Sequence, residues 1–131
     1  MAQKPEGGSI KHDISVSIHK IPEFLERAGE IIEREMPTAR ICAFGHMGDG
    51  NLHLVVSVGQ SDRKGVEACV YEPLADISGA VSAEHGVGLE KKPYLGIARS
   101  DTEIDLMRTL KRALDPKGIL NPGKIFDLDA A

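Results

Sequence analysis

Alternating and helically spaced hydrophobic residues divide the first half of the chain into predicted elements. Residues 10–18 alternate strictly between apolar and polar positions, which predicts a half-buried β-strand. One face of this strand carries His12, Ile14, Val16 and Ile18, and the other carries Lys11, Asp13, Ser15 and Ser17. Apolar residues at helical spacing then predict a helix from about Pro22 to Met36, before a second proline. Two strands, residues 40–46 and 52–58, follow on either side of a turn.

The next segment predicts a second helix. Ser61 or Asp62 is its expected N-cap, and the helix should run to about Ser78. Pro73 is expected to interrupt or kink it, because proline lacks the N–H that an interior helical position needs. Gly79 is the expected C-cap.

A fourth strand and a third helix complete the series. Residues 80–83 are small and β-permissive, and we expect them to form a short strand. Ser100 and Glu103 form a capping box that opens the third helix. Asp115-Pro116 ends this helix, whose apolar stripe is Ile104, Met107, Leu110 and Leu114.

This order of elements predicts an α+β fold. The sequence strand–helix–strand–strand–helix–strand is the ferredoxin-like split βαβ pattern, an antiparallel sheet with helices on one face. Here it carries an extra C-terminal helix and tail. Residues 1–9 are expected to form a flexible leader, and residues 10–131 a single domain.

The Asp49-Gly50 dipeptide predicts a two-residue type I′ turn between the second and third strands. That turn would place His46 directly opposite His53. One face of this strand pair is strongly apolar and consists of Ile41, Ala43, Leu52, Leu54, Val56 and Val58. The other, which we call the mixed face, consists of Cys42, Phe44, His46, His53, Val55 and Ser57. A half-apolar second face indicates a cover, either the third helix and tail or another protein domain.

Composition narrows the functional classes. The net charge of −4 and the low aromatic content argue against a nucleic-acid partner or an anionic membrane surface. No apolar run is long enough for a membrane span. Cys42 and Cys69 show no spacing motif and are expected to be reduced, packed thiols, which favours a cytoplasmic localisation.

Two histidines across one hairpin could share a metal ion, since imidazole nitrogen is a common ligand of zinc and similar ions. Glu84 or His85, at the end of the fourth predicted strand, would supply a third ligand. Alternatively, Glu84 binds the metal while His85 acts as a base toward a substrate. The competing interpretation is that His46 and His53 are ordinary side chains hydrogen-bonded across the hairpin. His12 and His19 are expected to be structural or exposed.

Three motifs in order carry a resemblance to a known family. The segments GHMGDGNLHL (45–54), SAEHGVGLEKKPYLG (82–96) and DPKGILNPGK (115–124) resemble the C-terminal domain of FAD-linked oxidases. Within that group they are most similar to the D-2-hydroxyacid dehydrogenases, such as the D-lactate and D-2-hydroxyglutarate enzymes and the glycolate oxidase flavin subunit. The segment KHDISVSI (11–18) is also similar to a strand of the family.

The resemblance implies specific roles. His46, His53 and Glu84 would hold a divalent metal, usually zinc, His85 would be the general base, and Asn51 would bind substrate. A small 2-hydroxy acid would be oxidised by hydride transfer to FAD. Nothing in the chain corresponds to the family's flavin-binding region, so a flavin-binding domain or subunit is the expected partner. The chain alone is then expected to be inactive.

Two other functional classes remain open at this point. The chain could be a stand-alone, non-catalytic module that binds a metal, a small acid or a partner protein, or a remnant without function. The intact quartet of His46, His53, Glu84 and His85 counts against a remnant. The mixed face of the isolated chain is expected to self-associate, as a homodimer.

Overall fold

The computed structural model describes residues 9–46, 48–58 and 63–128 and has an α+β fold. The strands are β1 (Ser9–Ser15), β2 (Arg40–His46) and β3 (Asn51–Ser57). The α-helices are α1 (Ile21–Glu35), α2 (Arg63–Ile77), α3 (Leu95–Ala98) and α4 (Asp101–Leu114), and the short 3-10 helices are η2 (Ile18–Lys20) and η3 (Lys92–Tyr94). The predicted architecture, an antiparallel sheet with helices on one face and an extra C-terminal helix, is confirmed.

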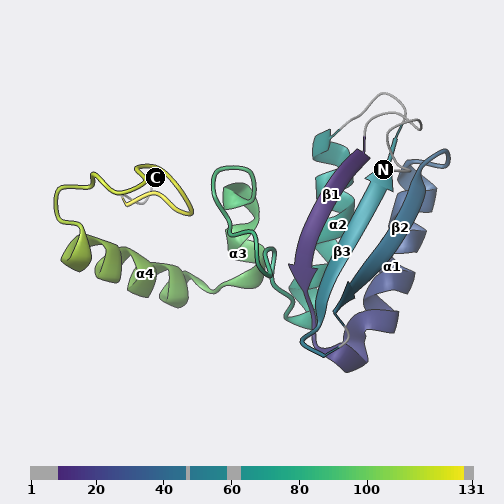
Figure 1. The fold of residues 1–131 in the computed structure, drawn as a ribbon, viewed down its shortest axis with the longest axis horizontal. Coiled ribbons are helices and arrows are strands. Elements are labelled where there is room, and N and C mark those ends of the chain that lie inside the picture. Colours follow the sequence, from purple (N-terminus) through teal and green to yellow (C-terminus); the bar gives the residue numbers. More distant parts are fainter. Residues whose placement is uncertain (1–8, 47, 59–62, 129–131) are drawn as a thin grey trace.

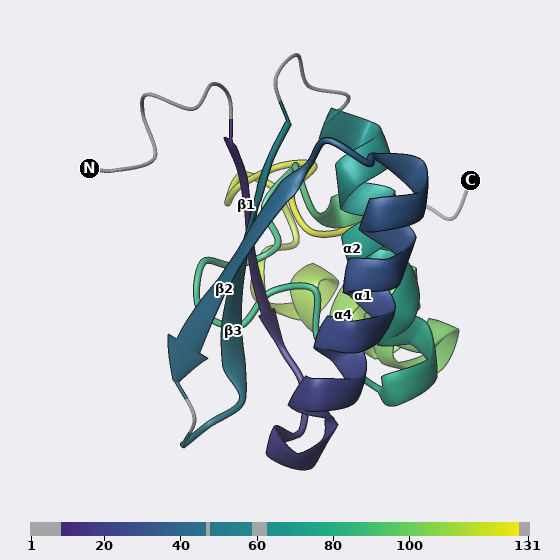
Figure 2. The same cartoon turned by 90° about the vertical axis from the view of Figure 1, so that its right-hand side faces the viewer.

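The sheet has the order β1-β3-β2, and both pairings are antiparallel. Helices α1 and α2 pack side by side against one face of it (Figures 1 and 2). The alternation in β1 and β3 supplies the apolar side chains for this layer, because every second residue of a strand points to the same face. The largest fully buried apolar side chains of this core are Ile14, Phe24, Ile32, Leu54 and Leu74. The central strand β3 therefore packs its apolar side chains against the helices, and the mixed face lies on the opposite side of the sheet.

The register of the β2–β3 hairpin differs from the prediction by two residues. His46 pairs with Asn51, and His53 pairs with Phe44. Residues 47–50 thus form the connection, and only Gly50 in it adopts a positive φ, of 75°, among its described residues. Asp49 instead uses its side chain, whose Oδ1 accepts a hydrogen bond from the Asn51 amide at 3.0 Å. A shift of two residues leaves each side chain on its predicted face, because the strand period is two.

The first and fourth predicted strands also need correction. β1 ends at Ser15, and Ile18 lies in η2 with 49% of its surface exposed. Residues 80–83 do not form a strand; only Ala80 pairs, in an isolated bridge with Ser15. The reason is that the amides of residues 83–85 bond to the Asp13 side chain rather than to a strand backbone. The segment therefore becomes a loop along β1.

Helix α2 runs through Pro73 without interruption, so the predicted break does not occur, and the alternative of a kink stays a prediction. Its predicted N-caps, residues 61 and 62, lie outside the described residues. At its C-terminal end Ser78, not Gly79, takes the left-handed conformation, with φ of 55°. The Gly79 amide donates to the Leu74 carbonyl at 3.1 Å, which closes the helix as a Schellman motif.

Helix α4 begins with the predicted capping box of Ser100 and Glu103 and ends directly before Asp115. Its predicted apolar stripe is buried only at Ile104, while Leu110 and Leu114 are exposed. The helix and the C-terminal segment lie to one side of the sheet and do not cover the mixed face (Figures 1 and 2). Residues 1–8 of the predicted leader are outside the described part of the chain, and Ser9 already belongs to β1.

The two cysteines are both free but differ in environment. Cys69 is buried as predicted, whereas Cys42 is exposed, so the expectation of two packed thiols is wrong for Cys42. Every residue of the edge strand β2 is exposed, which explains the position of Cys42. In the described residues no helix combines the length and the apolar character needed to cross a bilayer.

Candidate metal centre

Strand pairing arranges the side chains around His46 and His53 in two rows across the sheet. In the first row Asp13 of β1, His53 of β3 and Phe44 of β2 stand opposite one another. In the second row Ser15, Asn51 and His46 do the same. His46 and His53 are therefore diagonal neighbours, with ring centroids 5.9 Å apart. The sheet alone brings these two imidazoles together.

The loop along β1 adds Glu84 to the pair. Its Oε1 lies 3.2 Å from His53 Nε2, and one ligand atom from each of His46, His53 and Glu84 lies within 4.8 Å of the others. Two donors on a single zinc ion are at most about 4.2 Å apart, twice a Zn–N bond. A small closing movement of exposed side chains would satisfy this limit, since about half of the His46 and Glu84 side-chain surface is free to solvent.

Asn51 orients the carboxylate of this group. Its Nδ2 donates to Glu84 Oε1 at 2.8 Å, and the residue is 6% exposed. The Asn51 Oδ1 atom is buried, and no hydrogen-bond partner for it exists among the described residues. Asn51 thus contacts the candidate site, as a buried partner of the Glu84 carboxylate.

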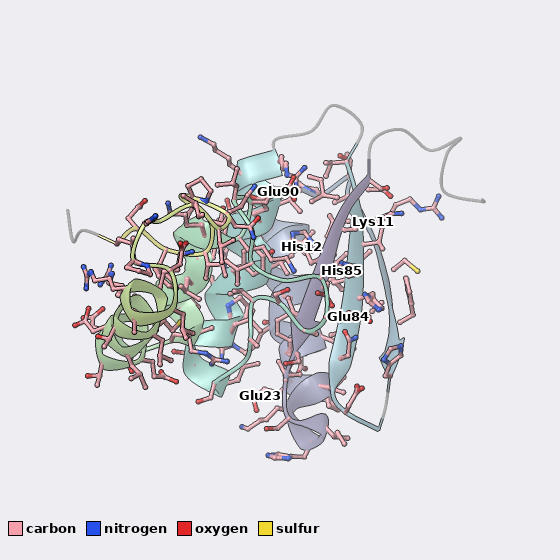
Figure 3. All side chains as sticks on the ribbon, turned by 60° about the vertical axis from the view of Figure 1, so that its left-hand side comes forward. Lys11, His12, Glu23, Glu84, His85 and Glu90 are labelled. Atoms are coloured by element: carbon pink, nitrogen blue, oxygen red, sulfur yellow. The ribbon has the colours of Figure 1, made fainter. Side chains whose placement is uncertain are left out.

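His85 lies next to Glu84 on the same loop (Figure 3). Its ring stacks near that of His53, with centroids 5.9 Å apart, and two thirds of its side chain is exposed. A surface pocket of about 230 Å³ adjoins it, lined by Lys11, Asp13 and residues 85–91. Gly86 and Gly88 form its wall with positive φ angles, which permit the sharp path of this loop. An imidazole faces a cavity beside three potential metal ligands.

Three larger pockets lie elsewhere among the described residues. One is lined by Lys111, Gly118 and residues 120–128, and another by residues 80–82, Val87, α3, α4 and the tail. The third lies between α1 and α2. None of the four candidate residues lines any of these pockets. The smaller pocket next to His85 is therefore the one that adjoins the candidate site.

Asp13 is the residue that sequence reasoning missed. It is 2% exposed, and its Oδ2 accepts hydrogen bonds from the amides of Glu84 and His85 at 3.0 and 2.8 Å. Burial alone would raise the pKa of Asp13, but these amides and the nearby Lys91 ammonium outweigh it and hold the pKa at about 2. One signal was available: aspartate is disfavoured inside strands, so a central aspartate requires a specific partner.

The other histidines lie outside the site. His19 is exposed in η2. His12 is buried between sheet and helices, where its ring packs edge-on against Tyr71 and its Nδ1 contacts the Leu54 carbonyl at 3.2 Å. Both agree with the prediction that these residues are structural or exposed.

Comparison with known proteins defines the class. Residues 1–125 match the family described as FAD linked oxidases, C-terminal domain, and the chain belongs to this family. A D-2-hydroxyglutarate dehydrogenase from Stutzerimonas stutzeri (strain A1501) is 43% identical over 124 residues, which cover 88% of this chain and 27% of the relative. The mitochondrial D-2-hydroxyglutarate dehydrogenase of Bos taurus is 40% identical over 129 residues, covering 95% of this chain and 23% of the relative.

A third relative has a different printed activity. The D-2-hydroxyglutarate–pyruvate transhydrogenase of Saccharomyces cerevisiae is 40% identical over 128 residues, 90% of this chain and 26% of the relative. The chain thus spans about a quarter of the length of the curated relatives it matches. The resemblance seen in the three sequence motifs is confirmed at the level of the family.

Proposed function

We propose that this chain is the metal- and substrate-binding part of a flavin-dependent D-2-hydroxyacid dehydrogenase. The observation that carries the proposal is the convergence of His46, His53 and Glu84, with His85 on the adjoining loop and a pocket beside it. The names of the relatives, which are D-2-hydroxyglutarate dehydrogenases and a transhydrogenase, support the substrate class.

The ligand set of His46, His53 and Glu84 fits a divalent metal, and zinc is the metal that we propose. Two imidazoles and a carboxylate are the ligands of many catalytic zinc sites, which keep a further position open for substrate. A metal ion bound there would polarise the hydroxyl and carboxylate oxygens of a 2-hydroxy acid. Asn51 holds the Glu84 carboxylate toward the histidines through its 2.8 Å bond. We further propose that Asn51 contacts the substrate, since it lies beside the Glu84 carboxylate.

His85 would act as the general base. Its imidazole would accept the substrate hydroxyl proton, the task for which histidine is most often used. Glu84 and His85 are neighbours in sequence, yet Glu84 turns to His53 while His85 lies against the 230 Å³ pocket. The proposed base therefore lies beside the metal ligands, with its ring 5.9 Å from that of His53, and also borders the pocket. FAD, held by a flavin-binding domain or subunit, would accept the hydride from the substrate α-carbon.

The exposed surface of β2 is the place where we expect that flavin-binding partner. Phe44 is 54% exposed and Ile41 is 41% exposed on a strand that is open on both faces. The loop along β1 bonds to Asp13 and Asn51 and so covers the other part of the mixed face. Without the partner, the chain should not turn over. Cytoplasmic localisation stays a prediction, and the Bos taurus relative is named as mitochondrial.

Zinc titration calorimetry on the purified, metal-free chain tests the metal site. We expect one ion per chain and at least a tenfold weaker affinity for His53→Ala. His19→Ala is the matched control, because it removes an exposed imidazole outside the site. Equal zinc affinity of the wild type and His53→Ala would refute the site.

A dye-reduction assay separates the catalytic part from a stand-alone binding module. The chain with added FAD and D-2-hydroxyglutarate should give no turnover. Addition of the flavin-binding region of a family member should restore turnover for the wild type but not for His85→Asn. A module without catalytic function would bind zinc and remain inactive in every combination.

A further inference from the structure

A single buried carboxylate connects β1 to the loop that carries Glu84 and His85. We propose that Asp13 is a positioning residue that fixes this loop so that Glu84 faces the histidine pair and His85 faces the pocket. The inference rests on the proposed function and deepens it, since it assigns a residue that the metal and base roles do not include.

The contacts of Asp13 are concentrated on one atom. Its Oδ2 accepts hydrogen bonds from the consecutive amides of Ala83, Glu84 and His85, at 3.2, 3.0 and 2.8 Å. The Ser82 hydroxyl donates to the same oxygen at 3.2 Å. Three successive main-chain amides directed at one oxygen fix the backbone from which both functional side chains leave.

Lys91 closes the loop from its other end. Its Nζ donates to the Asp13 carbonyl at 3.0 Å and to the Ser82 hydroxyl at 2.9 Å, and it lies 3.4 Å from Asp13 Oδ2. A buried carboxylate without partners would be strongly destabilising, and this ammonium group compensates its charge. Both ends of the segment 82–91 are therefore held by one residue of β1.

The register of β1 and β3 places Asp13 next to the proposed metal ligands. Asp13 stands directly opposite His53, so the residue that holds the loop also sets its distance to the central histidine. Glu84 Oε1 reaches His53 Nε2 at 3.2 Å from this position. Asp13 could also be read as a ligand, because it lies close to Glu84 and His85. Its Oδ2 is already used by three amides and a hydroxyl, which favours positioning.

The variant Asp13→Asn tests this role, with Asp115→Asn as matched control. Asp115 is also a buried carboxylate that accepts two loop amides, from Ile119 and Leu120, and it pairs with Lys111. It lies in the C-terminal segment, outside the site. The readouts on the 131-residue chain are zinc affinity by calorimetry and amide hydrogen exchange by NMR without metal.

We expect Asp13→Asn to weaken zinc binding tenfold or more, the usual effect of losing a partner that orients a ligand. Exchange at residues 83–85 should accelerate selectively, while Asp115→Asn changes neither readout. Wild-type zinc affinity together with wild-type exchange at these amides would overturn the assignment, as would equal zinc losses in both variants.

Two further results remain decisive. Should Asp13→Asn fail to fold, Lys91→Met replaces it, with faster exchange at the same amides expected and unchanged exchange overturning the role. Absence of zinc binding by the wild type would defeat the proposed metal site. The exchange comparison would still decide whether Asp13 holds the loop.

Discussion

The buried imidazole of His12 should make folding depend on pH in a predictable window. Burial is the main cause that lowers the pKa of His12, from 6.5 to about 4. Its Nε2 has no hydrogen-bond partner among the described residues, and its Nδ1 contacts only the Leu54 carbonyl. The charged form is therefore strongly disfavoured in the folded state but not in the unfolded chain.

The sign and size follow from proton linkage. Above pH 6.5 the imidazole is neutral in both states and contributes nothing. Below it the unfolded chain binds the proton first, so stability falls as the pH decreases and the loss is complete below pH 4. The free energy of unfolding should drop by about 2 kcal/mol between pH 8 and pH 5, and by about 3 kcal/mol at pH 4.

Urea unfolding followed by far-UV circular dichroism, with EDTA present, measures this loss. His12→Leu should change stability by only about 1 kcal/mol at pH 8, because it removes one weak hydrogen bond and one unpaired nitrogen. Between pH 8 and pH 5 it should lack the 2 kcal/mol decline, whereas His19→Leu should retain it. An equal decline in wild type and His12→Leu would refute the assignment.

Three further predictions concern stability and assembly. A Cβ at Gly79 would lie 2.5 Å from Leu74 Cδ2, so Gly79→Ala should destabilise by about 1–3 kcal/mol. A Cβ at Gly29 in α1 would have no atom within 4 Å, so Gly29→Ala should instead stabilise the protein slightly. Denaturant titration of both variants measures the two effects. Unchanged stability of Gly79→Ala would contradict the packing around Gly79. Ser100→Ala removes the capping box of α4 and should cost about 1 kcal/mol, measured by thermal unfolding, with Thr109→Ala as exposed control. The isolated chain should form a homodimer through its exposed mixed face, and light scattering that shows only monomer at high concentration would contradict this.

The sequence was most informative where local chemistry decides the structure. Strand alternation assigned every described side chain of the β2–β3 pair to its correct face, and the capping box located the start of α4. The two-residue register error left the faces intact, so His46 and His53 still became neighbours. The error arose because the Asp49 side chain could replace a backbone turn, which dipeptide statistics do not reveal.

Hydrogen bonds between side chains and residues far apart in the sequence could not be predicted from local patterns. The composition of residues 80–83 permits a strand, but the Ala83 amide bonds instead to the Asp13 carboxylate, 70 residues away in the sequence. The aspartate inside β1 indicates that a partner is needed, but nothing local to either segment indicates which residues supply it. The hydrogen bond from Asn51 to Glu84 is a long-range contact of the same kind. The sequence therefore indicated the four candidate residues, His46, His53, Glu84 and His85, but not the hydrogen bonds that hold Glu84 and its loop in place.

The position of His46 at the end of an exposed edge strand has a consequence for motion. His53 belongs to the buried central strand, whereas β2 is exposed along its whole length and, within the described residues, has a strand neighbour on one side only. Such edges open locally more readily than central strands. An ion that binds both His46 and His53 would connect the exposed edge strand β2 to the buried central strand β3. Metal binding should therefore slow local opening of β2 more than that of β3, and so stabilise the exposed surface on which we propose that the flavin-binding partner docks.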